Sequence, residues 1–369
     1  MKSAIKVGVI VCVQGAAAFL TATPAWAQSS VTLYGMVDAG LLYTSKTPNA
    51  AGTNGGAEVS FENAGYYPTK LGLKGSEDLG SGYSVNFDWQ SGIDLSTGGF
   101  DNNLAGSVFG RESWVGLNGP YGELRFGVQF SPFEDALYEL DPRSFSQLGS
   151  MITLYSSNIV TGTFSPNAIE YRSPVVSGLR VNLMANFGSN SGNFRDGFGY
   201  SGMMSYEVGG FKFVAGAMDQ VAANGTPTSN AAYDFSMPVI AKTLGVMYHW
   251  ASVKIAASYT NFRAPVLLGN ALDGANDIYN IGADWRMSPT FESNLAVSYI
   301  RDPDASGSYA FQVAAGLNYF LSKRTTLYSQ VAVVDNHGGE HMGPTMENGN
   351  LVGVSGTTVA ANIGIRHAF

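Results

Sequence analysis

The sequence predicts an all-β membrane protein, a 16-stranded antiparallel transmembrane β-barrel, from three observations. Polar and apolar residues alternate along segments of about 10–12 residues, short turns alternate with long polar connections, and charged residues are scarce. Charged residues make up 13% of the 369 residues, against about 25% in an ordinary soluble domain, whereas 12% are aromatic and 46 are glycine. This composition excludes a disordered chain. The formal net charge of −8 argues against binding to nucleic acid.

Residues 1–27 have the pattern of a cleaved secretory signal peptide. Two lysines precede an apolar stretch at residues 7–20, and a small-x-small cleavage site ends at Ala27. The only cysteine, Cys12, lies in this segment, so thiol catalysis and cysteine-bound metals are excluded from the mature chain. Loss of the two lysines changes the net charge from −8 to −10. We expect residues 28–369 to form a single β-barrel pore domain.

Alternation with a period of two runs through the mature chain. Apolar residues take every second position in residues 83–90, 179–187, 253–260, 291–299 and 309–319. Each such segment has one apolar and one polar face when it is extended. A soluble, exported β-sandwich gives the same alternation and is one alternative. The segment length, the aromatic ends of the apolar stripes and the alternation of short and long connections favour a barrel in a membrane.

The segments amount to sixteen predicted strands, at residues 31–44, 59–75, 83–93, 107–117, 122–130, 166–173, 179–188, 198–207, 211–219, 238–249, 252–262, 276–286, 290–301, 308–319, 326–336 and 356–369. An even number of strands places both chain ends on the same, periplasmic side. Sixteen strands enclose an aqueous channel, whereas eight leave an interior that side chains fill.

Motifs along the whole mature chain resemble those of a known family. They include Ser-Ser-Val-Thr-Leu-Tyr-Gly at residues 29–35, Leu-Gly-Leu-Lys-Gly-Ser-Glu-Asp-Leu-Gly-Ser-Gly at residues 71–82 and Gly-Ile-Arg-His-Ala-Phe at residues 364–369. In these motifs the chain resembles the general trimeric porins of Gram-negative outer membranes. The resemblance implies a homotrimer in the cell outer membrane, in contact with lipid and lipopolysaccharide, that has no cofactor. Such a protein lets small hydrophilic solutes and ions diffuse passively.

The resemblance further implies that the third outer loop folds into the pore, where its carboxylates face basic residues of the wall. Residues 131–165 form the longest stretch without alternation, and a loop of this length is normally functional. The acidic candidates in this loop are Glu134, Asp135, Glu139 and Asp141. From spacing alone, solvated loop charges are an equal alternative.

The basic candidates on the wall are Lys70, Lys74, Arg111 and Arg125. Lys70 and Lys74 lie opposite leucines on one strand, and Arg125 lies opposite Leu124 and Phe126, so all three point into the lumen. Arg111 matches a basic position of the family. If Trp114 faces outward, Arg111 faces inward and Glu112 faces outward, against a neighbouring subunit. Alternatively, each of the four bases lies at the rim of the barrel and extends its charged end to water.

Three positions that are often basic in the family carry Met36, Val128 and Glu170 here. Fewer basic residues and a net charge of −10 predict weak charge selectivity with a preference for cations. A different function is a solute-specific channel with a saturable binding site in the pore. We expect no enzymatic activity, because the four histidines form no nucleophile-and-base arrangement and no Gly-x-Ser-x-Gly motif occurs.

Overall fold

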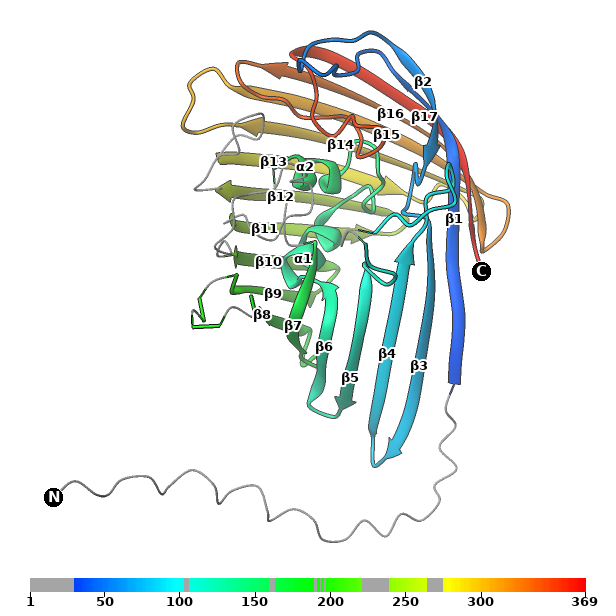
Figure 1. Cartoon of the computed structure of the whole chain (residues 1–369), viewed down its shortest axis with the longest axis vertical. Helices are drawn as coiled ribbons and strands as arrows, with labels where there is room; N and C mark the ends of the chain where they lie inside the picture. The colour runs from blue at the N-terminus through cyan, green and yellow to red at the C-terminus, as the bar shows by residue number, and fades with distance from the viewer. Residues whose placement is uncertain are drawn as a thin grey trace, which may run out of the picture.

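The computed structural model describes residues 30–102, 106–158, 163–188, 191–192, 194–195, 197–220, 239–263 and 275–369. The expected signal peptide at residues 1–27 lies outside the described residues. In Figure 1 the strands form one continuous curved wall, and two short helices lie on its concave side.

The described part of the wall consists of seventeen strand segments. In chain order they are β1 (Ser30–Thr44), β2 (Glu58–Asn63), β3 (Lys70–Gly80), β4 (Tyr83–Gly92), β5 (Glu112–Gly119), β6 (Gly122–Phe130), β7 (Phe164–Arg172), β8 (Leu179–Asn186), β9 (Gly199–Val208), β10 (Phe211–Gln220), β11 (Val239–Trp250), β12 (Val253–Arg263), β13 (Ala275–Trp285), β14 (Phe291–Arg301), β15 (Tyr309–Phe320), β16 (Thr325–His337) and β17 (Gly356–Ala368). The helices are α1 (Pro132–Leu140) and α2 (Met151–Asn158).

Two of the segments, β2 and β3, form one strand of the barrel. β2 pairs with β1 from Ala39 to Thr44, and β3 pairs with the other half of β1, from Ser30 to Met36. Residues 64–69 interrupt this strand. The wall therefore has 16 antiparallel strands, and β17 pairs with β1 to close it. The predicted 16-stranded antiparallel barrel is confirmed.

The two faces of the wall carry the residues that alternation predicts. On β14, Leu295 and Val297 are exposed on the outer face, whereas Asn294 and Ser298 are buried on the inner face. Outward-facing aromatic rings also meet across neighbouring strands: the ring centroids of Tyr259 and Tyr279 lie 5.1 Å apart. An apolar outer face and a polar inner face suit a wall between lipid and water.

Short turns and long connections alternate around the barrel. β9 and β10, for example, are joined only by Gly209 and Gly210, which have positive φ angles of 57° and 85°. Glycine adopts this conformation at little steric cost, so the turn can be this tight. The connections at the opposite end are longer, such as residues 45–57 and 338–355.

The connection between β6 and β7, here called the pore loop (residues 131–163), is more ordered than the sequence predicts. It contains α1 and α2, whereas the sequence indicates only a stretch without alternation. The Ser131 hydroxyl accepts a hydrogen bond from the backbone N–H of Glu134 at 3.2 Å, and Pro132 occupies the first turn. Both features favour the start of a helix. Among the described residues, no helix has the length and hydrophobicity needed to cross a bilayer.

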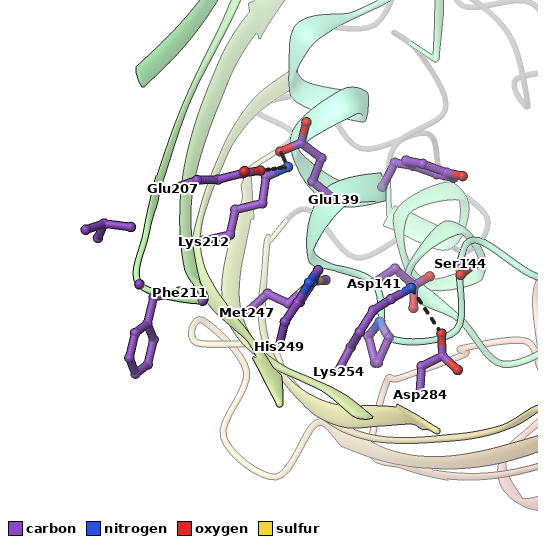
Figure 2. Close-up of a pocket in the computed structure, with 15 residues that line it drawn as sticks. Glu139, Asp141, Ser144, Glu207, Phe211, Lys212, Met247, His249, Lys254 and Asp284 are labelled. Atoms are coloured by element: carbon purple, nitrogen blue, oxygen red, sulfur yellow. Dashed lines mark hydrogen bonds and ion pairs between the residues drawn. The ribbon is translucent and has the colours of Figure 1, made fainter. Parts of the chain in front are cut away.

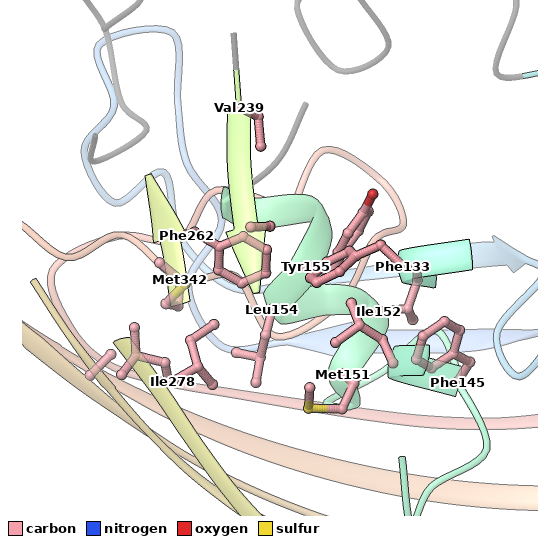
Figure 3. Close-up of a cluster of buried hydrophobic side chains, with 14 of the residues drawn as sticks. Phe133, Phe145, Met151, Ile152, Leu154, Tyr155, Val239, Phe262, Ile278 and Met342 are labelled. Carbon is pink, nitrogen blue, oxygen red and sulfur yellow. The ribbon is translucent and has the colours of Figure 1, made fainter. Parts of the chain in front are cut away.

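The pore loop packs on the inside of the wall through a buried apolar cluster (Figure 3). Phe133, Leu154 and Tyr155 of the loop lie against wall residues such as Phe262 and Ile278. These wall side chains are apolar although they face inward, because the loop covers them. The loop thus occupies part of the lumen, and through Leu148 it also packs against Leu42 of β1.

Candidate pore constriction

Small wall residues allow α1 to lie close to the barrel. A Cβ atom built on Gly216 of β10 would lie 2.8 Å from the Cβ of Ala136. Gly245 of β11 is likewise in contact with Leu140, and Gly282 of β13 with Pro142. The absence of side chains at these glycines brings the backbone of the helix against the wall. The contacts of Gly216 and Gly245 position α1, and that of Gly282 positions the residue that follows soon after the helix.

Arg143 anchors the pore loop to the far wall. Its fully buried guanidinium donates hydrogen bonds to Asn294 on β14 at 2.6 Å and to Gln330 on β16 at 2.8 Å. It also donates to the carbonyl oxygen of Leu148, within the loop, at 3.0 Å. Burial lowers the pKa of Arg143 to about 10, so the group remains charged at neutral pH. Multiple hydrogen bonds are what a buried charge requires.

Asp141 holds the loop in shape from within. Its buried carboxylate accepts hydrogen bonds from the backbone N–H groups of Arg143 at 2.8 Å, Met151 at 2.9 Å and Phe145 at 3.1 Å. Burial raises the pKa of this carboxyl, and the N–H groups act in the opposite direction. Asp141 therefore links the end of α1 to the start of α2.

Two other acids of the pore loop, both on α1, pair with cations on the adjacent wall. A carboxylate oxygen of Asp135 lies 3.2 Å from a guanidinium nitrogen of Arg172 on β7. Glu139 pairs with Arg180 on β8 and, at 3.0 Å, with Lys212 on β10. Figure 2 shows Lys212 between Glu139 and Glu207. These ion pairs link α1 to the adjacent wall.

Arg172, Arg180 and Lys212 are not among the bases predicted from the sequence. Strand alternation predicts that Arg180 and Lys212 face inward, because Arg180 lies between Leu179 and Val181 and Lys212 lies between two phenylalanines. The same test had identified Arg125. Arg172 lies at the end of β7, where no further apolar neighbour marks the outer face.

Two of the predicted bases meet two of the predicted acids at one cavity. This cavity, called the aromatic cavity below, has a volume of about 320 Å³ and is lined by Lys70, Arg111, Glu134, Asp135 and several aromatic residues. Nε of Arg111 donates a hydrogen bond to Gln90 at 2.9 Å, and its guanidinium lies 4.9 Å from the ring centre of Phe164. The loop and the wall therefore contribute opposite charges to the same space.

The other two predicted bases lie outside the aromatic cavity. The ammonium group of Lys74 lies 5.0 Å from the ring centre of Tyr34. Arg125 is paired with Glu123 at 2.7 Å and stacks on Trp114, 3.9 Å from the ring centre. Lys74 and Arg125 lie on the wall. Among the described ion pairs, neither is paired with an acid of α1.

Trp114 does not face outward, so the condition under which Glu112 would face a neighbouring subunit is not met. Trp114 is buried on the inner face, and its indole N–H donates to the carboxylate of Glu112 at 2.6 Å, whereas Val115 is exposed on the outer face. Glu112 therefore faces inward, and no neighbouring subunit is needed to shield it. β5 begins at Glu112 and not at residue 107. Arg111 therefore lies outside the strand, and the alternation of side-chain directions does not determine where it points. Arg111 reaches the aromatic cavity from the connection before β5.

Comparisons with known proteins agree with this architecture. The family model described as Gram-negative porin matches residues 15–339. The chain belongs to the Gram-negative porin family. It is 29% identical over 367 residues to outer membrane porin protein 32 of Delftia acidovorans, covering 94% of this chain and 95% of the relative. It is 24% identical to an outer membrane porin protein of Bordetella pertussis, covering 94% of this chain and 96% of that relative.

A solved structure of an anion-selective porin from Comamonas acidovorans superimposes on this porin with a TM-score of 0.76 and 25% identity, covering 93% of this chain and all of the other. The chain is thus an outer-membrane porin, and its relatives are channels and not enzymes. The short turns of the barrel accordingly face the periplasm.

A second cavity, of about 490 Å³, lies on the periplasmic side of α1 (Figure 2). It is lined by Glu139, Asp141, Lys212 and residues of the short β9–β10 turn. Tyr138, which is half exposed, lines both this cavity and the aromatic cavity. Tyr138 therefore belongs to the lining of both cavities.

The charge of Glu134 changes with pH near neutrality. Its side chain is buried, and burial together with the charge of Asp135 raises its pKa to about 8. The group is therefore mostly protonated at neutral pH. Because its pKa in the folded loop exceeds the ordinary value, the docked loop loses stability as the pH rises from about 4.5 to about 8.

We expect alkaline pH to loosen the pore loop through Glu134, at a cost on the order of a few kcal/mol. Open-channel current noise in a planar bilayer should rise between pH 6 and pH 9 in the wild-type porin. A Glu134→Gln variant, which imitates the protonated acid, should show a smaller rise. An equal rise in both proteins would contradict a role for Glu134.

Proposed function

We propose that this porin forms a water-filled channel through which small hydrophilic solutes and ions diffuse passively, narrowed by the pore loop. The observation that carries the proposal is a closed 16-stranded wall with one inward-folded loop packed against the inner face of that wall. In this proposal the constriction lies beside α1, where Asp135 and Glu139 meet wall cations. Fixed charges of both signs there orient dipolar solutes and disfavour apolar ones.

We propose weak ion selectivity, because carboxylates of the constriction lie close to cations. Glu123 is paired with Arg125, Asp135 with Arg172, and Glu139 with two bases. Such pairs largely cancel beyond a Debye length of about 8 Å.

We expect a slight preference for anions, the opposite of the sign that the whole-chain charge predicts. Glu134 is mostly neutral at pH 7, and Lys70 makes no ion pair with any described residue. The net charge of −10 includes acids of distant outer loops, which are screened from the constriction. The anion selectivity of the similar Comamonas acidovorans porin supports this sign.

The test is single-channel recording of the purified porin in a planar bilayer. We expect stepwise insertions, a current proportional to voltage, and a small reversal potential of anionic sign under a salt gradient. Failure to conduct would contradict the channel, whereas a reversal potential of cationic sign would contradict only the charge assignment.

Replacing Asp135 by asparagine should increase the preference for anions. The substitution removes the carboxylate 3.2 Å from Arg172 and leaves the guanidinium charge less compensated. The reversal potential should shift toward the anion limit, and the shift should shrink at high salt. Asp302→Asn, in an outer connection, is the control and should leave the reversal potential unchanged. No shift for Asp135→Asn would place that residue outside the constriction.

We also propose that three copies of this porin assemble into a homotrimer whose apolar outer faces contact lipid, lipopolysaccharide and one another. A barrel of the same fold, OmpT of Vibrio cholerae, has been solved in a trimer form with a TM-score of 0.63 to this chain. Native electrophoresis in mild detergent before and after heating tests the assembly. A single monomer band in both samples would contradict it.

A further inference from the structure

The last outer loop, residues 338–355 between β16 and β17, meets the pore loop through its backbone. Thr345 of the last outer loop pairs with Leu148 of the pore loop in an antiparallel β-bridge. Two backbone hydrogen bonds flank this bridge: the N–H of Gly149 donates to the carbonyl oxygen of Pro344 at 2.9 Å, and the N–H of Met346 donates to that of Gln147 at 3.1 Å. The two loops therefore share a short piece of sheet.

Side chains of the last outer loop reinforce this contact. The hydroxyl of Thr345, which is fully buried, donates a further hydrogen bond to the carbonyl oxygen of Gln147 at 3.1 Å. Met342 belongs to the buried apolar cluster that also contains residues of α2 (Figure 3), and Met346 packs against that cluster. The two loops are therefore joined by hydrogen bonds and by apolar contact.

The barrel wall holds the last outer loop at two places. On β16, the side-chain amide of Asn336 donates hydrogen bonds to the carbonyl oxygens of Met342 at 3.0 Å and Val354 at 3.1 Å. On β2, the hydroxyl of Ser60 accepts a hydrogen bond from the side-chain amide of Asn348 at 2.8 Å. Because β17 and β1 lie between β16 and β2 in the wall, the loop spans several strands and is attached on both sides.

The contact falls on the part of the pore loop that connects Arg143 to α2. This part is also held from another direction, because the N–H of Gln147 donates to the carbonyl oxygen of Tyr66 at 3.1 Å, in the interruption between β2 and β3. Buried backbone N–H and C=O groups need hydrogen-bond partners, and those of the wall strands are used in pairing with neighbouring strands. The last outer loop thus supplies partners that residues 147–149 need inside the barrel.

The last outer loop also reaches the aromatic cavity. Met346 of this loop and Gln147 of the pore loop line that cavity together with Lys70 and Arg111. The outer loop at residues 45–57 differs, since the hydrogen bonds described for its residues 47–56 are made within that segment. Inward packing therefore distinguishes the last outer loop from this other outer loop.

We infer that the last outer loop is a second constriction element of this porin, which holds the pore loop in the lumen and thereby sets the conductance. Thr345 is a positioning residue in this role, because it acts through Gln147 of the pore loop. The inference rests on the proposed channel function and adds to it the loop that fixes the constriction. When the contact is lost, both loops can move out of the lumen, so the conductance and the current noise rise.

Shortening the last outer loop tests the inference by single-channel recording in a planar bilayer. Replacing residues 344–350 by Asn-Gly, which favours a tight hairpin turn, removes the contact with the pore loop. We expect a higher conductance and noisier current than in the unmodified porin. The matched control replaces residues 50–52 of the other outer loop by Asn-Gly and should leave both unchanged. An unchanged or lower conductance of the shortened porin would overturn the inference, whereas absence of current in the unmodified porin would overturn the channel itself.

A reversible disulfide tests the same contact without deleting any residue. The hydrogen bonds flank Leu148 and Thr345 as in a non-hydrogen-bonded antiparallel pair, whose Cα atoms lie about 4.5 Å apart, within the range of a disulfide. Residues 28–369 contain no cysteine, so the double variant Leu148→Cys with Thr345→Cys can form only this bond within one chain. We expect conductance at the wild-type level with reduced noise when it is oxidised, and a reversible rise of both on reduction.

Pro48→Cys with Asn54→Cys is the matched control for the disulfide. These two residues form the same kind of pair inside the other outer loop, with flanking hydrogen bonds from Asn49 to Thr53 and from Gly55 to Thr47. Reduction of this control should leave the current unchanged. Failure of the disulfide to form between the two loops would show that they do not meet, and identical currents before and after its reduction would show that their contact does not set the conductance. Either result would overturn the inference.

Hydrogen exchange tests the role of Thr345. Thr345→Val keeps the shape of the side chain but removes the hydroxyl that donates to Gln147. We expect the N–H of Gly149, on the other loop, to exchange about fivefold faster, the scale of one hydrogen bond, as measured by mass spectrometry of the pore-loop peptide. Thr345→Ser, which retains the hydroxyl, should restore most of the protection. Equal exchange of Gly149 in the two variants would overturn the assignment of Thr345 as a positioning residue.

Discussion

Replacing Arg143 by methionine should raise the single-channel conductance of the porin and make the current noisier. Methionine keeps an unbranched side chain of similar reach but removes every donor of the guanidinium. The oxygens of Asn294, Gln330 and Leu148 then lose hydrogen bonds of 2.6, 2.8 and 3.0 Å. We expect docking of the pore loop to weaken by about 3 kcal/mol, since leaving buried polar groups unpaired costs about 1–3 kcal/mol each. The loop would then leave its place in the lumen for part of the time.

Conductance in a planar bilayer measures this effect, and limited proteolysis of the pore loop provides an independent measurement. Arg286→Met is the matched control, because Arg286 lies at a periplasmic turn, where it pairs with Glu292 at 3.1 Å and stacks on Phe320. The control should retain wild-type conductance and resistance to protease. If Arg143→Met behaves like the control, the buried guanidinium does not anchor the loop.

Replacing Gly216 by valine should reduce the conductance instead. A Cβ at this position would lie 2.8 Å from the Cβ of Ala136 and 3.2 Å from the Cγ2 of Thr243, which is closer than packed atoms normally approach. Overpacking of this kind costs about 1–3 kcal/mol, and α1 can relieve it by moving away from the wall into the lumen. A narrower channel passes less current at the same voltage.

A paired substitution separates this displacement from general damage to the fold. Gly216→Ala combined with Ala136→Gly transfers the methyl group from the helix to the wall and should restore most of the conductance lost in Gly216→Ala. Gly202→Ala on β9 is the control, because Gly202 lies opposite the outward-facing Leu183 and away from α1. If the double variant conducts no better than Gly216→Ala, the contact with Ala136 does not set the channel width.

Strand positions could be predicted closely because they depend on a local pattern. The predicted strand at residues 211–219 corresponds to Phe211–Gln220, and that at residues 290–301 to Phe291–Arg301. Successive side chains of an extended chain point to opposite faces, so alternation reports both the strand and the direction of each side chain. The predicted strand at residues 59–75 differs from the structure, because residues 64–69 interrupt it.

The constriction was only partly predictable, because its contacts join residues far apart in the sequence. The loop boundaries and the acids Asp135 and Glu139 could be identified, but not their partners Arg172 and Arg180. Arg111 shows a second reason: it lies just before β5, where the period of two no longer fixes direction. The roles of the eight predicted site residues in conduction remain predictions, to be checked by the variants above.

The sequence by itself determined a closed barrel with an apolar outer face, because the pleat of each strand and the pairing of neighbours follow from local alternation. Only the tertiary structure decided where the pore loop lies and which charges meet there. Arg143 finds Asn294 at a separation of 151 residues and Gln330 at 187, and α1 fits the wall where Gly216 has no side chain. These matches depend on shape and hydrogen bonding across the lumen, which no local period in the sequence records.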